Sequence, residues 1–218
     1  MNVIITMANS SHFRHAQTIC NMMTEAALVR GTGIAKRKPE YIRNKMHEDL
    51  SIIALDGNVP IGFCYIESWE GQKYVVNSGL ITHPNYRNIG LAKAIKKAIF
   101  TLSKEKFPDA KLFGITTSMA VMKINSNLGY KPVTFSELTQ DEKFWNGCKS
   151  CTNYDILKRT NKTMCICTGM VCDLSQIPEK NKKQTWNKFI QFLTQRKIRI
   201  QQKTNQFPQL NKFINNEK

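Results

Sequence analysis

The spacing of apolar residues divides the first part of the chain into helices followed by strands. A short strand is predicted at 3–6, and a helix follows a polar cap at 9–11, with apolar residues at helical spacing at Ile19, Met22, Met23, Ala26 and Ala27. Pro39 opens a second helix, to about His47, because proline fits the first helical turn. Strands are then predicted at Ser51–Leu55, Val59–Ser68 and Lys73–Ile81, joined by two glycine-containing turns. This part therefore predicts two helices and an antiparallel meander.

Beyond His83 the pattern changes to alternating helices and strands. A helix begins near Ile89 or Gly90 with a stripe of apolar residues, at Leu91, Ala94, Ile95, Ala98, Ile99 and Leu102. Lys93, Lys96, Lys97 and Lys104 lie off that stripe. Leu112–Thr116 has the pattern of a buried strand, and Ser118 caps a further helix. This order implies a parallel crossover beside the meander, in an α/β fold with a central mixed, mostly antiparallel sheet and helices on both faces.

The last part of the chain predicts short strands and then a basic extension. Strand patterns occur at Lys131–Phe135, Tyr154–Arg159 and Thr163–Val171. We expect a domain at 1–172, which includes a cysteine-rich hairpin at 147–172, and a basic, partly helical extension at 173–218. The extension carries apolar residues at helical spacing, Trp186, Phe189, Ile190 and Leu193. That face is expected to dock on the body, and a second subunit of a homodimer or an acidic partner are alternatives.

Charge and hydropathy limit the classes of function. The formal net charge is +16, and residues 174–218 contain ten Lys or Arg but only two acidic residues. A nucleic-acid partner is not favoured, because the remaining charge is spread over a long body and suits an anionic cofactor and substrate equally well. No apolar run approaches the roughly 20 residues of a membrane span. The start of the chain lacks the basic and apolar regions of a secretory signal. We therefore expect a cytoplasmic protein without membrane association.

The turn at residues 87–92 has the composition of a pyrophosphate-binding site. It consists of Arg87, Asn88, Ile89, Gly90, Leu91 and Ala92, between a strand and a helix. Backbone N–H groups converge in such a turn, and the helix dipole adds positive potential. Gly90 permits close approach of a ligand, and Arg87 supplies a cation at the entrance. A helix N-terminus with a convenient glycine is the structural alternative.

Two segments resemble the motifs of a known superfamily. Ser78–Ala92 resembles motif A of the GNAT N-acetyltransferases, which ends in Arg/Gln-x-x-Gly-x-Gly/Ala, and Ser118–Tyr130 resembles motif B. The resemblance covers residues 3–172. It implies a sheet that splays open between Lys73–Ile81 and Leu112–Thr116, with the pantetheine of acetyl-CoA or another acyl-CoA in the gap. The implied cofactor contacts are the turn at 87–92 together with Leu80, Ile81 and Ser118.

The resemblance also implies where catalytic groups lie. The motif B tyrosine that often protonates the leaving thiolate is replaced by Asn125, so Ser126, Ser118 or a water held by Asn125 are the candidates for that role. Backbone N–H groups of 77–81 are expected to meet the oxyanion. The base that deprotonates the amine is expected to be Glu67, with His83 as second candidate. A surface carboxylate and a connector histidine are the respective structural alternatives.

The segment between the first two helices is expected to select the acceptor. Arg30, Lys36 and Arg37 lie in it, and an arginine there is suited to hold a carboxylate. Favourable basic residues at a helix C-terminus are the alternative. The chain resembles GNAT proteins encoded with arginine-biosynthesis enzymes, which suggests acetylation or succinylation of a small-molecule amine such as glutamate. A non-catalytic CoA-binding module, or acylation of a protein or RNA-associated substrate, are the rival functions.

Five of the seven cysteines lie between 148 and 172. Cys148 and Cys151 form a CxxC pair, and Cys165 and Cys167 form a CxC pair in a predicted strand. Four thiolates suffice for a structural zinc ion. However, residues two apart on a strand start about 7 Å apart, so the strand would have to bend. The alternatives are small buried apolar residues or a redox pair.

Overall fold

The computed structural model describes residues 3–30 and 36–177. The chain divides into two units, Met1–Gln176 and Ile177–Lys218. The predicted amphipathic segment at 186–193 and nearly all of the predicted basic extension therefore lie outside the described residues. The same holds for most of the glycine-containing connector before Lys36.

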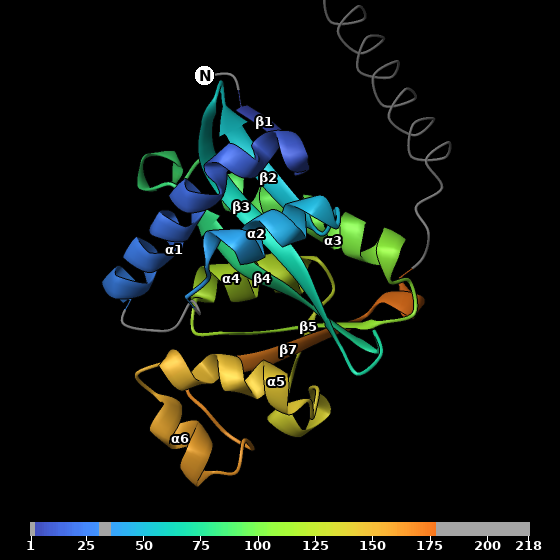
Figure 1. Ribbon diagram of the computed structural model, residues 1–218. Helices are drawn as coiled ribbons and strands as arrows, with labels where there is room; N and C mark the ends of the chain where they lie inside the picture. Colours follow the sequence, from blue (N-terminus) through green and yellow to red (C-terminus); the bar gives the residue numbers. More distant parts are fainter. Residues whose placement is uncertain (1–2, 31–35, 178–218) are drawn as a thin grey trace, which may run out of the picture. The chain divides into compact units, whose positions relative to one another are not determined.

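The described residues form a seven-stranded sheet in the order β1-β2-β3-β4-β5-β7-β6 (Figure 1). The strands are β1 (Val3–Met7), β2 (Ser51–Asp56), β3 (Val59–Trp69), β4 (Tyr74–Thr82), β5 (Lys111–Thr116), β6 (Lys131–Val133) and β7 (Thr168–Asp173). All neighbouring strands are antiparallel except β4 and β5, which are parallel. The predicted mixed, mostly antiparallel sheet is confirmed.

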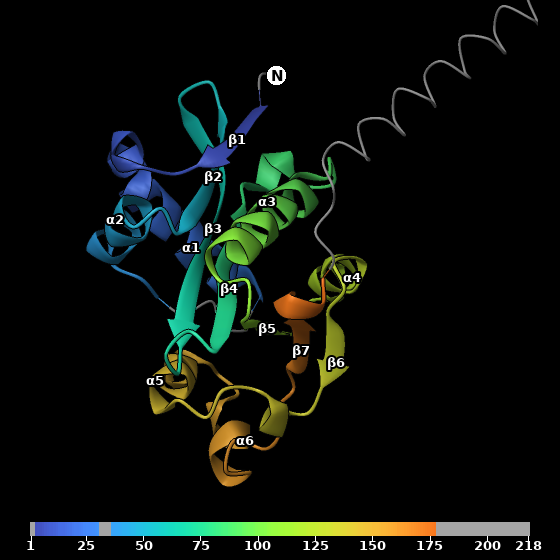
Figure 2. The ribbon, with the colours of Figure 1, turned by 90° about the vertical axis from the view of Figure 1, so that its right-hand side faces the viewer.

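Helices cover both faces of the sheet. They are α1 (Ala16–Arg30), α2 (Pro39–His47), α3 (Leu91–Lys106), α4 (Met119–Asn127), α5 (Glu142–Asn146) and α6 (Tyr154–Arg159). In Figure 2, α1 and α2 lie on one side of β2–β4 and α3 lies on the other. The side of α1 and α2 buries a core of methionine, isoleucine and aromatic side chains from both helices and from β2–β4. This arrangement follows from the apolar stripes that the sequence predicts on these helices.

Local signals in the sequence explain where several helices begin. Asn9 forms a capping box with His12 ahead of the 3-10 turn Ser10–His15, which leads into α1. The Ser118 hydroxyl accepts a hydrogen bond from the Val121 N–H, and this caps α4 as predicted. Gly90 is the N-cap of α3 and has a φ of 84°.

The segment between β6 and β7 differs from the prediction. The strand predicted at Tyr154–Arg159 is wrong, because these residues form α6, in which Leu157, three residues after Tyr154, is buried at helical spacing. The strand predicted at Lys131–Phe135 ends at Val133, and β7 begins only at Thr168. Residues 147–172 are therefore not a hairpin. They comprise a 3-10 turn, α6, a connecting segment and most of β7.

Within the described parts of the chain, no helix is long and apolar enough to cross a membrane.

Candidate acyl-transfer site

The sheet opens at the junction of β4 and β5. These strands pair only over Tyr74–Val76 and Lys111–Phe113. Beyond this point β4 continues to pair with β3 as far as Thr82, and β5 pairs with β7 as far as Thr116. The two strands therefore diverge beyond the Val76–Phe113 pair, and the splay that the resemblance implies lies where it was expected.

A bulge in β4 lies beside the splay. Phe63 pairs with Ile81 and Tyr65 with Ser78, so two residues of β4 oppose one residue of β3. Gly79, within the bulge, has a φ of 64°, and a Cβ atom there would lie 2.3 Å from the Tyr65 ring. Only glycine fits this position without displacement of the ring. Because a bulge takes a residue out of the ladder, it frees main-chain groups at the site where the oxyanion was expected.

The turn at 87–92 lies at the head of α3 and is exposed up to Gly90. Asn88 and Gly90 both have left-handed backbone conformations, with φ of 64° and 84°. A Cβ atom at Gly90 would meet no atom within 4 Å, so the glycine serves the backbone conformation rather than packing. Alternation of left-handed residues with others gathers N–H groups into an anion-binding concavity, and the first turn of α3 adds its own N–H groups.

A cavity of about 880 Å³ lies between the splayed strands, α2 and the segment that contains α5 and α6. The splayed parts of β4 and β5, including Leu80, line it together with Ser118 and Glu67. Ile81 is buried in the core beside α1 instead. The cavity thus reaches the strands between which the cofactor arm was expected.

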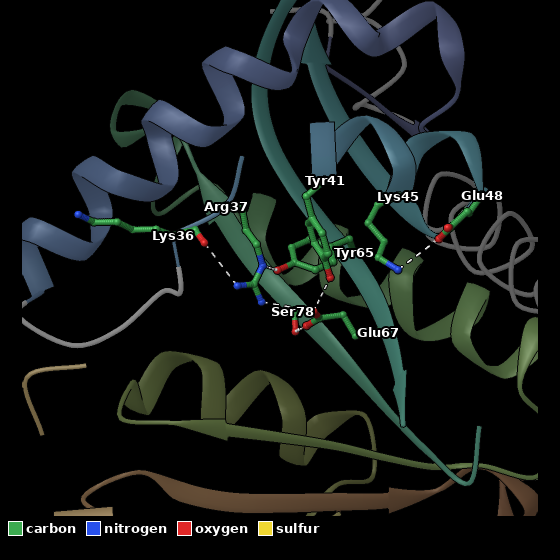
Figure 3. Close-up of polar contacts among 8 residues, drawn as sticks. All are labelled: Lys36, Arg37, Tyr41, Lys45, Glu48, Tyr65, Glu67 and Ser78. Carbon is green, nitrogen blue, oxygen red and sulfur yellow. Dashed lines mark hydrogen bonds and ion pairs between the residues drawn. The ribbon is translucent and has the colours of Figure 1, made fainter. Parts of the chain in front are cut away.

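Glu67 lies at the centre of a polar network on the wall of this cavity (Figure 3). Its Oε1 atom accepts hydrogen bonds from Tyr41 Oη at 2.5 Å and from Arg37 Nη2 at 3.3 Å. Its Oε2 atom accepts one from Ser78 Oγ at 2.5 Å. Glu67 is only 8% exposed, so the alternative of a surface carboxylate is wrong. Because each carboxylate oxygen can accept two hydrogen bonds, Oε2 has room for one more beside the bond from Ser78, counting donors from residues 3–30 and 36–177.

Two tyrosines complete the network, and the sequence analysis did not single them out. Tyr65 Oη accepts a hydrogen bond from Arg37 Nε at 2.9 Å, and the rings of Tyr41 and Tyr65 meet edge to face. Burial, followed by the charge of Glu67, raises the pKa of both phenols, so that both stay protonated. Tyr65 and Glu67 are two residues apart on β3 and share one face of the strand. That alternation of polar residues in an apolar strand is the signal that could have found Tyr65.

The predicted acceptor-binding cations are placed differently from one another. Lys36 is exposed and lines the cavity. Arg37 also lines the cavity, but its guanidinium already binds Glu67 and Tyr65, so fewer of its N–H groups remain for a substrate. Lys38, which the sequence analysis did not propose, is a further exposed lysine on the cavity wall. The side chain of Arg30 lies outside the described residues.

The other catalytic candidates do not gather around the cavity. Asn125 is 2% exposed, and its Oδ1 atom is one of two buried side-chain polar atoms without a partner among the described residues. Ser126 is exposed and does not line the cavity. His83 caps the turn at 84–86 by accepting a hydrogen bond from the Asn85 N–H, as expected of a connector histidine.

The four clustered cysteines line the far end of the cavity, beside aromatic side chains such as Trp69 and Phe144. In residues 3–30 and 36–177, no three His, Cys, Asp or Glu side chains are arranged to hold a metal ion, so the predicted zinc site is not supported. Cys165 and Cys167 precede β7 and do not lie in it. Burial, followed by the neighbouring thiols, raises the pKa of Cys148 to about 11 and that of Cys167 to about 12. These two thiols are therefore protonated at neutral pH and suit an apolar wall.

Known protein families and solved structures resemble this chain. Residues 20–119 match the family described as Acetyltransferase (GNAT) family. This part of the chain is therefore similar to the GNAT acetyltransferases. No curated protein sequence matches this one.

Solved acetyltransferases share the fold. N-acetylglutamate synthase from Neisseria gonorrhoeae, complexed with coenzyme A and N-acetyl-glutamate, is 16% identical with a TM-score of 0.57, over 80% of this chain and 35% of that one. This chain thus spans about a third of that protein. Phosphinothricin acetyltransferase from Sinorhizobium meliloti, in complex with AcCoA, is 13% identical with a TM-score of 0.54, over 83% of this chain and 95% of that one. Ribosomal-protein-S18-alanine N-acetyltransferase from Escherichia coli is 12% identical with a TM-score of 0.50, over 82% of this chain and 98% of that one. Together with the match to the family model, these structures show that the chain has the fold of N-acetyltransferases.

Proposed function

We propose that the protein transfers an acetyl or succinyl group from acyl-CoA to a primary amine, with a small anionic amino acid such as glutamate as the acceptor. The observation that carries this proposal is the splay of β4 and β5 onto a cavity that also contains a buried carboxylate, Glu67. The acyl-CoA pyrophosphate would bind the turn at Arg87–Ala92, and the pantetheine arm would enter the splay.

Glu67 is suited to receive the proton of the acceptor amine. An amine must be neutral to attack a thioester, and its pKa of roughly 8 to 10 means that a base is needed at neutral pH. The free hydrogen-bonding position on Oε2 lies next to Ser78, on the β4 strand that borders the splay. A water molecule or the amine itself could donate a hydrogen bond there. Arg37 and Tyr41 hold the other oxygen and fix the orientation of the carboxylate.

The acyl transfer itself needs a group that stabilises negative charge on the thioester oxygen. Attack by the amine forms a C–N bond and moves the carbonyl electrons onto oxygen, and collapse breaks the C–S bond and releases the CoA thiolate. Main-chain N–H groups at the bulge of β4 are the nearest donors that the fold offers for the oxyanion. Asn125 cannot serve as an acid, so we infer that solvent protonates the thiolate.

The choice of glutamate follows from charge. Lys36 and Lys38 are exposed at the cavity, and both suit a carboxylate of the acceptor. The structural likeness to N-acetylglutamate synthase agrees with this choice, although the fold alone does not specify an acceptor. A location in the cytoplasm, where acyl-CoA and free amino acids are available, is part of the same proposal. Fractionation of cells with an antibody to the chain would test that location.

A screen of free-thiol release tests the proposed reaction. Acetyl-CoA and succinyl-CoA are each offered with the common amino acids, and the CoA thiol is detected chemically. We expect glutamate to give the fastest release. If no amine accelerates release above the rate without acceptor, although acyl-CoA binds, the protein is the non-catalytic CoA-binding module instead.

A further inference from the structure

Lys96 is a buried cation without an anion. It lies on the face of α3 that packs on the sheet and is 3% exposed, although it lies off the apolar stripe in the sequence. Among the residues that the structure describes, no carboxylate forms an ion pair with it. Its Nζ atom donates a hydrogen bond to Asn77 Oδ1 at 3.1 Å and lies 5.2 Å from the centre of the Tyr130 ring. A buried ammonium that lacks a counter-ion is strongly unfavourable, so this arrangement calls for an explanation.

The partner of Lys96 marks the point where the sheet opens. Asn77 is the first residue of β4 after the last pair with β5, and it lines the cavity. Its Oδ1 atom also accepts a hydrogen bond from Tyr130 Oη at 3.3 Å, and its Nδ2 atom donates one to Ser103 Oγ at 2.8 Å. These bonds tie β4 to α3 and to Tyr130, which directly precedes β6. Lys96 and its partners therefore hold the vertex of the splay.

A neutral donor could also form the hydrogen bond to Asn77. This hydrogen bond therefore does not explain why the buried residue carries a charge. The thioester is expected on the other side of this vertex, and its attack by an amine creates negative charge on oxygen and then on sulfur. A cation in buried surroundings is poorly screened by water and acts over several ångströms. An anion that forms in the splay would thus provide the counter-charge that the protein lacks.

We propose that Lys96 is a positioning residue of the acyl-transfer site, which fixes the vertex of the splay through Asn77 and whose ammonium group stabilises the negative charge that develops on the thioester. This inference rests on the proposed acyl-CoA chemistry and adds to it a charged group that acts from behind β4.

Among Lys96 and its described neighbours, only Lys96 changes its charge near pH 8. Its neighbours are Cys64 of β3, Asn77 of β4 and Tyr130. Burial raises the pKa of Cys64 to about 11, and burial also raises the pKa of Tyr130, so both are neutral near pH 8. Burial lowers the pKa of Lys96 to about 8, so its charge is lost as the pH rises through that value.

The test compares Lys96→Met with Lys97→Met, the same change at the adjacent, exposed position of α3. Both variants are assayed across pH with acetyl-CoA and the best acceptor, after a check that they are folded. We expect kcat of Lys96→Met to fall about tenfold at pH 7, with little change in the acceptor KM, and Lys97→Met to stay within about twofold of wild type. The ratio of wild-type to Lys96→Met kcat should fall as the pH rises above 8 and Lys96 loses its charge, and the ionisation of the acceptor cancels in this ratio.

A binding experiment separates this inference from the proposed reaction. Calorimetry measures the affinities for CoA and for desulfo-CoA, which lacks the thiol, and neither ligand reacts. We expect Lys96→Met to weaken binding of CoA more than that of desulfo-CoA below pH 8, where Lys96 carries its charge and favours the thiolate form of bound CoA. Such selectivity would support the role of Lys96 even if no amine is acylated. Unchanged kcat ratios together with unchanged selectivity for the thiol would overturn the inference.

Discussion

Two buried charges lie on opposite sides of the sheet beside the splay, and they are satisfied in opposite ways. Glu67 accepts hydrogen bonds from three side chains, one of them the cation Arg37. Lys96 donates a hydrogen bond to Asn77, and no anion pairs with it in the described parts of the chain. A paired charge holds strands and helices in place, whereas an unpaired one is tolerated where a ligand or a reaction supplies the opposite charge.

The comparison predicts that removal of the Glu67 charge destabilises the protein, whereas removal of the Lys96 charge stabilises it. Loss of Glu67 leaves a cation and two hydroxyl donors without their acceptor. Loss of Lys96 removes the cost of burying an ammonium group for which the described residues supply no opposite charge. A structural role for both charges would predict loss of stability in both cases.

The largest effect is expected for Glu67→Gln. The change removes the carboxylate that faces Arg37, and a broken buried pair costs about 3 kcal/mol of the free energy of unfolding. Activity should fall as well, because the base is lost. Chemical denaturation measures the first effect and thiol release the second. Glu48→Gln is the control, since Glu48 is 50% exposed and pairs with Lys45 near the surface, where such a pair contributes less than about 1 kcal/mol. Equal losses in the two variants would contradict the account.

A smaller gain is expected for Lys96→Met. Replacement of a buried charge by an apolar side chain of similar length should stabilise the protein by about 1 to 3 kcal/mol at pH 7. The folded-state pKa of about 8 lies below the ordinary 10.5, so the unfolded chain binds more protons between these values. Wild-type stability, relative to the variant, should therefore rise with pH in this window. Denaturation curves at several pH values check this, and a variant that is less stable at pH 7 would refute it.

The smallest effect is expected for Tyr41→Phe. The variant removes one of the three donors to Glu67 and leaves Arg37 and Ser78 in place. A single hydrogen bond to a charged group contributes about 1.5 kcal/mol. Tyr86→Phe removes a hydrogen bond to Asp56 nearer the surface and should cost less. Thermal unfolding measures the stability of both variants. A larger loss of stability in Tyr86→Phe than in Tyr41→Phe would contradict the account.

Elements with strong local signals were predictable from the sequence. The helix α2 begins at Pro39, Ser118 caps α4, and the apolar stripe of α3 follows directly after Gly90. The splay also lies where the resemblance implied it, because it depends on the order of strands and helices.

The surroundings of the charges were not predictable in the same way. Tyr41 and Glu67 meet across 26 positions, and only the packing of α2 on β3 brings them together. Lys96 lies off the apolar stripe in the sequence, but Ile99 and Ser103 continue its face of α3 and are buried with it. The prediction for the segment between β6 and β7 was wrong because short apolar runs fit a strand and a helix equally well.

Calorimetric titration of CoA onto three forms of the protein tests the central claim that a thioester carrier binds at the head of α3. The forms are the wild type, Gly90→Glu and Gly57→Glu. Gly57 also has a positive φ, and a side chain would meet no atom there either, so both changes impose a similar backbone strain. We predict that Gly90→Glu abolishes CoA binding by placing an anion where the pyrophosphate belongs, and that Gly57→Glu binds as the wild type does. Normal CoA affinity in Gly90→Glu would contradict the account.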